Sequence, residues 1–332
     1  MKASSPQISS WVVQGDQQGM RLDSFVRRCL PHLSLRQAQK AIGEGAFRVN
    51  RRRGKKGDRL QAGDAVEFDG APEWLAATPL PGGDLNVIVR YEDESVLVLD
   101  KPAEIATHGF SGRETNSLAN FLSARYPALH GVGRSRWQPG LANRLDQGTS
   151  GLVLAARDRA AFDDLRSQFR RGLVKKKYWA LVWGRAPKQG VLDLPLAHDP
   201  GDRRKMRVAS APRGRAAKAK IWPALTRFRL AGHAEEFSLL EVEIGTGVTH
   251  QIRVHLQAAG HPIVGDPLYG REPNPVEASG PRGFTGPLGL RRQFLHAFFL
   301  DFRHPRDGRE IVVESPLPED LNEVTERLGL QF

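Results

Sequence analysis

The chain lacks the features that several large protein classes require. It has one cysteine, Cys29, among 332 residues, so no disulfide can form within it and a cysteine-based metal site is not expected. No apolar run is long enough to span a bilayer, and the N-terminus has no apolar segment of signal-peptide length. We therefore expect a cytoplasmic protein without a metal, a disulfide or a membrane partner.

Two common signatures of nucleotide-binding enzymes are also missing. There is no GxxxxGKS/T loop and no GxGxxG after an expected strand, which argues against P-loop and dinucleotide-binding folds. No repeat of fixed period indicates a solenoid. Many short expected strands and few long helices favour an α+β fold with a mixed sheet, and a length of 332 residues favours two domains.

Basic residues are in clear excess. The chain has 49 Lys and Arg against 37 Asp and Glu, a formal net charge of +12. Such an excess indicates a polyanionic partner, most simply a nucleic acid. An anionic membrane is the competing partner, but no basic amphipathic helix or lipidation signal accompanies the charge.

The N-terminal part of the chain predicts a loose arm and a small domain. Residues 1–18 are polar and are expected to pack little. In residues 19–70, apolar spacing from Leu22 predicts one helix, Ser34 is a good cap for a second, and a basic turn joins two short strands. The basic residues expected to contact RNA phosphates in this domain are Arg36, Lys40, Arg51, Arg52 and Arg53. A solvated basic face is the alternative.

The rest of the chain predicts a linker and a larger domain. Residues 71–85 are rich in Pro and Gly and are expected to form the linker, and residues 86–332 the domain. Strands are expected over 87–89, 96–99, 152–156, 178–183, 237–244 and 294–302, and helices over 117–126, 159–169 and 316–330.

A long basic stretch lies inside the larger domain. Residues 198–220 carry interspersed Gly and Pro, which predicts a mobile loop that becomes ordered on a phosphate backbone. Lys205 and Arg207 are its candidate RNA contacts. A solvated loop without a ligand is the alternative.

A carboxylate occupies a glycine-containing loop directly before an apolar strand. Asp146 lies in residues 141–151, and the apolar residues 152–156 follow. An acid presented in this way is a candidate nucleophile or general base. The same Arg-Leu-Asp tripeptide also occurs at residues 21–23, and a charged turn between strands is the simpler interpretation, so the context must decide.

Residues 245–260 form the second informative stretch. Thr249 is a candidate N-cap and Gly260 a C-terminal stop for a helix. His250 and Arg253 share a polar face of that helix, so a guanidinium could reach a carboxylate. His250, His255 and His261, which follows the stretch, do not share a helix face, so a metal site is not expected there.

The small N-terminal domain resembles the S4 RNA-binding domain. The matching residues are Arg21-Leu-Asp23, residues 34–42, residues 45–50 and residues 63–66. Arg51 stands where that family usually has Gly after the Asn, which adds a positive charge to the turn.

The larger domain resembles the RluA-type family of pseudouridine synthases. The matching pieces are Val96 to Pro102, Arg144-Leu-Asp146 with Thr149-Ser-Gly151, Lys177-Tyr178 with residues 180–182, residues 249–253 with 255–256, and residues 260–262 with 265–270. The resemblance implies a mixed, mostly antiparallel sheet with a central catalytic cleft and no cofactor. It implies isomerisation of specific uridines to pseudouridine in RNA.

The pairing of an S4 domain with such a core implies a particular substrate. It is the arrangement of family members that modify large-subunit ribosomal RNA, so we expect 23S ribosomal RNA or a precursor ribosomal particle as the partner of a monomer. Asn143 and Val248 depart from residues that are common in the family, which leaves the target uridine open.

The resemblance also assigns roles to residues. Asp146 is the catalytic carboxylate, Tyr178 stacks against the target uracil, and Arg253 pairs with Asp146. Arg144 helps to displace the target base. The substrate-binding candidates as a group are Arg144, Thr149, His250 and Gln251.

The expected chemistry agrees with these residue types. Isomerisation breaks the N1–C1′ bond, turns the base and makes a C5–C1′ bond, so neither a redox step nor a cofactor is needed. The carboxylate either attacks the nucleoside or takes a proton from the sugar, and the sequence leaves both open. The target base must leave its stack, which costs a few kcal/mol and is offset by stacking on an aromatic side chain.

Three alternative functions stay open at this point. The first is a non-catalytic S4-type RNA-binding protein, which has no need of the three catalytic candidates. The second is a pseudouridine synthase that acts on transfer RNA. The third is a carboxylate-dependent glycoside or nucleoside hydrolase, which usually needs two catalytic acids, whereas the motifs contain one.

Overall fold

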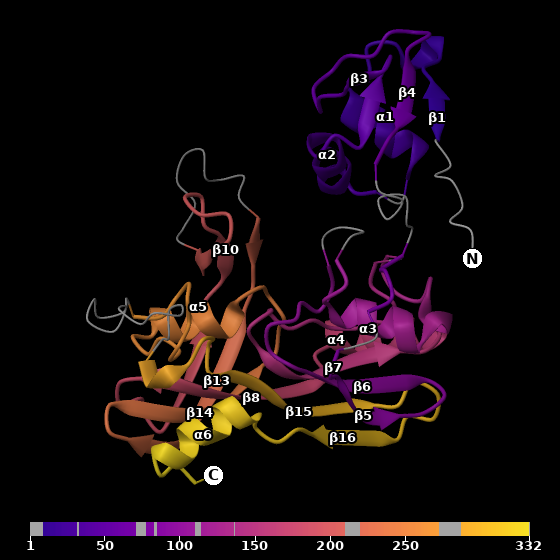
Figure 1. The fold of residues 1–332 in the computed structure, drawn as a ribbon. Helices are drawn as coiled ribbons and strands as arrows, with labels where there is room; N and C mark the ends of the chain where they lie inside the picture. Colours follow the sequence, from indigo (N-terminus) through magenta and orange to yellow (C-terminus); the bar gives the residue numbers. More distant parts are fainter. Residues whose placement is uncertain are drawn as a thin grey trace. The chain divides into compact units, whose positions relative to one another are not determined.

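The computed structural model describes residues 9–331 except 32, 71–77, 83–84, 110–113, 136, 210–219 and 272–286 (Figure 1). The chain divides into two compact units. The first comprises Met1–Leu85 with His108–Pro139, and the second comprises Asn86–Thr107 with Gly140–Phe332. No helix in the described residues is long and apolar enough to cross a membrane.

A four-stranded antiparallel sheet and two helices form the N-terminal part of the first unit. The strand order is β1-β4-β2-β3. The elements are β1 (Ser10–Val12), α1 (Leu22–Cys29), α2 (Leu35–Gly43), β2 (Phe47–Val49), β3 (Arg52–Arg53) and β4 (Ala65–Phe68). Both predicted helices are confirmed. The predicted cap is confirmed too, because the Ser34 hydroxyl accepts a hydrogen bond from Gln37 N at 3.2 Å.

The N-terminal arm is more ordered than the sequence predicted. Ser10–Val12 pairs with β4, and Val13 is buried against the core of the unit together with the partly buried Trp11. The prediction of a loose arm is therefore wrong for residues 10–13, because two apolar residues in a polar segment are enough to dock a short edge strand.

The turn between β2 and β3 explains why glycine would suit position 51. Val49 pairs with Arg52, so Asn50 and Arg51 form a two-residue hairpin turn. Their φ angles are 49° and 65°, the left-handed region that such turns require at both positions. Asn tolerates this region, whereas an arginine there costs about 1–2 kcal/mol.

The second unit is built on a nine-stranded sheet. Its order is β5-β6-β7-β15-β8-β14-β13-β9, with β16 paired to β15. All neighbours are antiparallel except β7 and β15, so the predicted mixed, mostly antiparallel sheet is confirmed. The strands are β5 (Ile88–Glu92), β6 (Val96–Lys101), β7 (Ser150–Ala156), β8 (Lys175–Trp183), β9 (Gln189–Asp193), β13 (Leu225–Ala234), β14 (Phe237–Ile244), β15 (Leu295–Arg303) and β16 (Glu310–Glu314).

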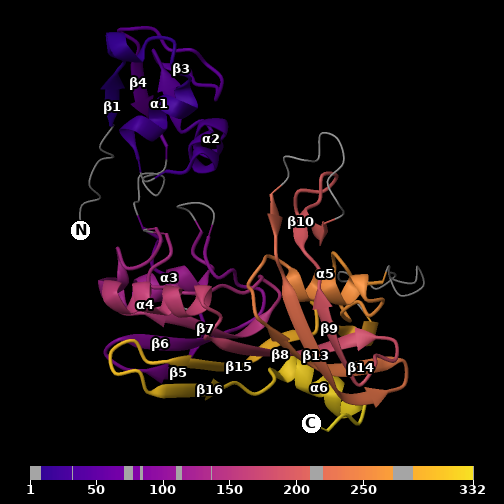
Figure 2. The same ribbon diagram turned by 180° about the vertical axis from the view of Figure 1, so that it is seen from behind.

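Helices cover this sheet on both sides. Figures 1 and 2 show α4 (Arg159–Arg170) and α5 (Gln251–Ala258) above the sheet in both views, and α6 (Glu319–Arg327) at its lower side. The helix predicted over 159–169 and the terminal helix are confirmed. A separate small sheet, β11-β10-β12, joins β10 (Leu196–His198), β11 (Met206–Val208) and β12 (Ile221–Trp222).

The basic stretch 198–220 is therefore not a loop throughout. Met206–Val208 pairs with Leu196–His198, so the loop prediction is wrong for those residues. Met206 is buried against Tyr269, and this contact fixes the strand. Residues 210–219 lie outside the described part of the chain.

Strand β7 approaches β15 so closely that only glycine fits at one position. Every residue of β7 is buried. Gly151 has a φ of 112°, and a Cβ there would lie 2.2 Å from the carbonyl oxygen of Ala297. Because Gly151 permits this close backbone contact, the start of β7 is fixed against β15. The loop before β7, which carries Asp146, is positioned by this contact.

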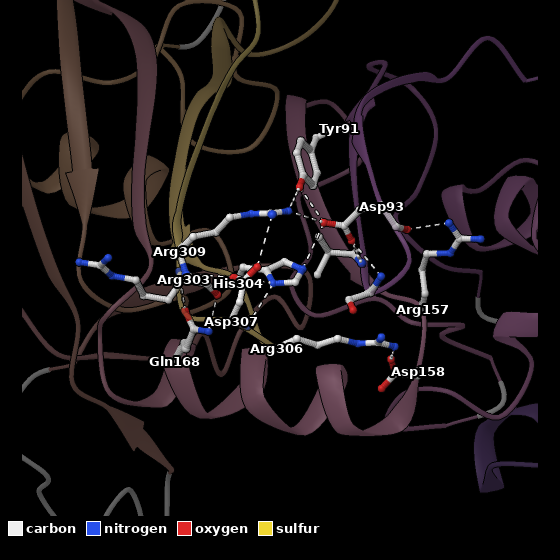
Figure 3. Close-up of polar contacts among 12 residues, drawn as sticks. Tyr91, Asp93, Arg157, Asp158, Gln168, Arg303, His304, Arg306, Asp307 and Arg309 are labelled. Atoms are coloured by element: carbon white, nitrogen blue, oxygen red, sulfur yellow. Dashed lines mark hydrogen bonds and ion pairs between the residues drawn. The ribbon is translucent and has the colours of Figure 1, made fainter.

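Asp93 gathers polar contacts at one end of the sheet (Figure 3). Its Oδ2 accepts a hydrogen bond from the Tyr91 hydroxyl at 2.6 Å, lies 3.1 Å from His304 Nε2 and lies 3.3 Å from Arg309 Nη2. Its Oδ1 accepts bonds from two backbone N–H groups of its own turn. The carboxylate thus ties the β5–β6 turn to the β15–β16 turn.

Replacing Asp93 by Ala should lower the free energy of unfolding by about 1–3 kcal/mol, because its buried partners lose their acceptor. Burial opposes the charged form of Asp93, but the bonds from Tyr91 and the backbone outweigh it, so its pKa lies below the ordinary value. The stabilisation is therefore complete above the unfolded pKa of about 3.9 and is lost as pH falls through the folded pKa. Denaturant unfolding between neutral and acid pH measures this.

The matched control is Asp163→Ala. Asp163 lies on the exposed face of α4, and its pair with Arg159 has 67% and 59% exposed side chains. Such a pair contributes little, about 0.3–0.5 kcal/mol. Equal losses in the two variants, or an Asp93→Ala loss that persists undiminished at acid pH, would contradict the assignment.

Candidate active site

The loop that carries Asp146 is held by buried groups on both sides of it. The Thr107 hydroxyl donates to Leu145 O at 2.8 Å and accepts from Leu145 N at 3.0 Å. The carbonyl oxygen of Asp146 accepts from Thr149 N at 3.0 Å. The backbone of the loop is therefore fixed, while the Asp146 side chain remains 25% exposed.

A buried lysine supports the same loop. Lys101 is fully buried, and its ammonium donates to Pro102 O, Ile105 O and Gln147 O at 2.8, 2.9 and 3.2 Å. Burial lowers its pKa to about 7, the charge of Arg292 adds to this, and the charge of Asp146 opposes it. The sequence did not single out Lys101 or Thr107, because a strand-end lysine and a loop threonine have no local sign of burial.

Arg253 bridges two carboxylates. Its Nη1 donates to Asp146 Oδ2 at 3.0 Å, as the sequence predicted. Its Nε and Nη2 donate to the two oxygens of Asp266 at 2.6 and 2.8 Å. The guanidinium is 4% exposed and lies over the ring of Tyr269 at 5.0 Å. This geometry leaves one Asp146 oxygen without an arginine bond.

The charge of Arg253 is secured by its partners. Burial opposes the charged form, but the hydrogen bonds and charge of Asp266, and then those of Asp146, outweigh burial and raise its pKa above the ordinary value. Asp266 itself is fully buried and also accepts bonds from two backbone N–H groups. Asp266 therefore positions Arg253, and both of its carboxylate oxygens already accept hydrogen bonds.

Tyr178 lies in the middle of the sheet, on β8 between β14 and β15. It is 6% exposed. Burial raises its pKa, and the nearby negative charge of Asp146 raises it further. The side chain is therefore a neutral phenol close to the carboxylate, and its ring can serve as a stacking surface.

His250 lies near Asp146, and its chain neighbour Thr249 contacts Arg144. The exposed Arg144 donates a hydrogen bond to the Thr249 hydroxyl. His250 Nε2 lies 3.8 Å from Asp146 Oδ2, and its Nδ1 lies 2.8 Å from the Tyr269 hydroxyl. Burial lowers the pKa of His250, which favours a neutral ring at neutral pH.

The predicted N-cap of α5 is wrong. The residue before the helix is His250, in the left-handed conformation with a φ of 56°. Thr249 lies one position earlier, and its hydroxyl accepts the bond from Arg144. The sequence predicted a cap at Thr249 because it shows only partners that are near in the chain, and it does not show the contact with Arg144.

Two substrate-binding candidates are part of the framework. Thr149 is 2% exposed, and its hydroxyl accepts from Gln293 Nε2. Gln251 is 3% exposed and binds the Thr246 hydroxyl, Val248 N and Leu225 O. Their side chains hold the loops that carry Asp146 and His250.

The predicted RNA contacts lie in both units. The first unit exposes Arg36, Lys40, Arg51, Arg52 and Arg53. Lys205 and Arg207, in the second unit, are half-buried, and Arg207 lies on β11 of the small sheet. Among the described residues, no group of three or more His, Cys, Asp or Glu side chains could hold a metal ion.

Comparison with known proteins identifies the family. A model of RNA pseudouridylate synthase matches residues 95–258, and an S4 domain model matches residues 20–66. A protein of Chloroflexus aurantiacus named as an uncharacterized RNA pseudouridine synthase is 40% identical, over 96% of this chain and 92% of its own length. The chain belongs to the RNA pseudouridine synthase family. It is thus an isomerase that acts on RNA.

Further relatives and a solved structure agree. The ribosomal large subunit pseudouridine synthase D of Neisseria meningitidis serogroup A is 34% identical over 94% of this chain and 80% of that protein. The structure of human RNA pseudouridylate synthase domain containing 4 covers 74% of this chain and 94% of its own, with 25% identity and a TM-score of 0.57. The predicted family and fold are confirmed.

Exchanging Tyr178 should separate stacking from its hydroxyl. If a uracil stacks on the ring, Tyr178→Phe should retain more single-turnover pseudouridine formation than Tyr178→Leu. The Leu variant should lose a further tenfold or so, since stacking contributes about 1–3 kcal/mol. Equal rates for the two variants would argue against a stacking role.

Proposed function

We propose that this pseudouridine synthase isomerises specific uridines in large-subunit ribosomal RNA, with Asp146 as its catalytic carboxylate. One observation carries the proposal. Asp146 is a partly exposed acid on a rigid loop, held at 3.0 Å by an arginine that is itself locked by a buried second acid. Such a fixed, partly open carboxylate is what nucleophilic or general base catalysis needs.

The neighbouring residues supply the rest of the reaction. The carboxylate either attacks the nucleoside and is released when the C5–C1′ bond forms, or removes a sugar proton that is later returned. In both cases the N1–C1′ bond breaks, the uracil turns, the C5–C1′ bond forms, C5 loses its proton and N1 gains one. Arg253 holds the acid in position through this sequence. Tyr178 offers its ring to the extruded uracil, and Arg144 occupies the space in the RNA that the uracil leaves.

The S4 domain supplies RNA affinity in this proposal. Its exposed arginines and lysines carry no sequence information of their own, but they neutralise phosphates and position the RNA. A full-length protein and a form lacking residues 1–75 should therefore differ in the slope of log K against log salt, with the shorter protein showing the flatter slope.

The alternatives have less support. The full set of catalytic candidates argues against a protein that only binds RNA. A hydrolase would need a second acid within reach of the substrate, and the second acid here, Asp266, is fully buried with its oxygens occupied. The names of the relatives favour ribosomal RNA over transfer RNA as the substrate.

The proposal is tested by mapping pseudouridines in total RNA. RNA from cells with and without the protein is treated with carbodiimide, which marks pseudouridine, and the stops of reverse transcription are compared. We expect marks in large-subunit ribosomal RNA that disappear without the protein and return with the wild-type gene but not with Asp146→Asn. Marks that change only in transfer RNA would overturn the ribosomal assignment.

A further inference from the structure

Three consecutive lysines on β8 have different surroundings. Side chains alternate between the faces of a strand, so Lys175 and Lys177 lie on one face and Lys176 lies on the other, with Tyr178. Lys175 pairs with Asp301 at 2.7 Å and Lys177 with Glu241 at 3.3 Å. Lys176 has no ion pair among the described residues.

Lys176 is nevertheless the most buried of the three, at 9% exposed. Its ammonium donates one hydrogen bond, to Thr246 O at 3.3 Å, and lies 5.5 Å from the centre of the Phe169 ring. Burial lowers its pKa to about 8. A buried cation without a carboxylate is costly, which makes the surroundings of Lys176 favourable for an incoming anion.

A pocket of about 390 Å³ lies beside the surroundings of this ammonium, and its lining includes neighbours of Lys176 but not Lys176 itself. Phe169, Thr246 and Gly247, which all surround the Lys176 ammonium, line it. The rings of His198 and Trp222 also line the pocket. The exposed Arg170, at the end of α4, adds a guanidinium to the lining. The pocket therefore combines ring faces with positive charge.

The pocket shares one lining residue with the surroundings of the catalytic loop. Thr249 belongs to its lining and also accepts the hydrogen bond from Arg144. The next residue, His250, lies 3.8 Å from Asp146. An RNA strand whose target uridine reaches Asp146 can thus place a neighbouring nucleotide here.

We propose that this pocket is a second nucleotide site, which takes a nucleotide next to the target uridine, with its base against Trp222 and Phe169 and its phosphate in the field of Lys176 and Arg170. The inference rests on the proposed function and adds a binding site to it. Aromatic rings accept any base because each has a π face, so the site contributes affinity and strand direction rather than base identity.

The test uses the full-length protein and a short oligouridylate carrying 4-thiouridine. Photocrosslinks mapped by mass spectrometry should reach Trp222 or Phe169. In binding titrations, Trp222→Ala should weaken affinity on the order of tenfold. Lys176→Met should lower the slope of log K against log salt by about 0.7, the value for one phosphate on a single strand. Lys175→Met, which changes the paired neighbour on the opposite face, should leave that slope almost unchanged.

The outcomes separate this site from the proposed function. If wild-type protein forms pseudouridine but Trp222→Ala and Lys176→Met bind the oligouridylate as Lys175→Met does, the site is refuted and the function stands. If wild-type protein forms no pseudouridine, the function fails instead. Uridine monophosphate that competes at the same concentration as the oligouridylate would show a free-nucleotide pocket and overturn the strand assignment. Crosslinks on the wild-type protein keep the test valid if Lys176→Met does not fold.

Discussion

Asp146→Asn should abolish pseudouridine formation while leaving the fold and RNA binding intact. Asn keeps the shape of the side chain, but it is neither a nucleophile nor a base at neutral pH. Arg253 stays paired through its two bonds to Asp266, so no buried charge is left alone. RNA affinity rests mainly on basic contacts to phosphate and should survive. The measurement is single-turnover conversion of ribosomal RNA at saturating protein.

The control for this variant lies in the other Arg-Leu-Asp tripeptide. Asp23 is 1% exposed and accepts bonds from Arg21 and Gln39 within the S4 domain. Asp23→Asn should leave the chemical rate at saturating protein nearly unchanged. Comparable losses of rate in both variants would mean that Asp146 has no special role.

Arg253→Met should have the second largest effect, and it should act on two quantities. The single-turnover rate should fall on the order of a hundredfold, because Asp146 loses the group that fixes its position. The free energy of unfolding should fall by about 3–5 kcal/mol, because Asp266 is left fully buried without its cation. A loss of stability would therefore not show whether Arg253 acts on the chemical step or only on the fold.

A double variant resolves the ambiguity. Adding Asp266→Asn to Arg253→Met removes the unpaired buried charge, so much of the lost stability should return. The rate should stay low, since Asp146 still lacks its partner. Recovery of both stability and rate in the double variant would show that Arg253 matters only to the fold.

The parts of the fold that were predictable depend on local signals. The apolar spacing in α1, the Ser34 cap of α2 and the apolar run of β7 each show in a few neighbouring residues. Strand β13 was not predicted, because its two buried residues are the polar Thr226 and the apolar Phe228, which leaves a weak apolar alternation. Its buried face becomes evident only when β14 and β9 lie beside it.

The residues of the site likewise divide into those with a signal in the sequence and those without one. Asp146, Tyr178 and Arg253 were predicted because they lie in motifs that resemble a family. Asp266 was missed as the second partner of Arg253, although it lies in the matching stretch 265–270, because a bidentate contact between a helix and a following turn has no sequence signature. Lys101 and Lys176 were missed because the sequence alone does not distinguish a buried lysine from an exposed one.

One measurement tests the central claim most directly. RNA carrying tritium at C5 of uridine is mixed with excess wild-type protein or Asp146→Asn, and released tritium and free uracil are followed together. Forming the C5–C1′ bond displaces the C5 hydrogen, so wild-type protein should release tritium to water without releasing uracil, and Asp146→Asn should release neither. Tritium release by Asp146→Asn at the wild-type rate would contradict the account.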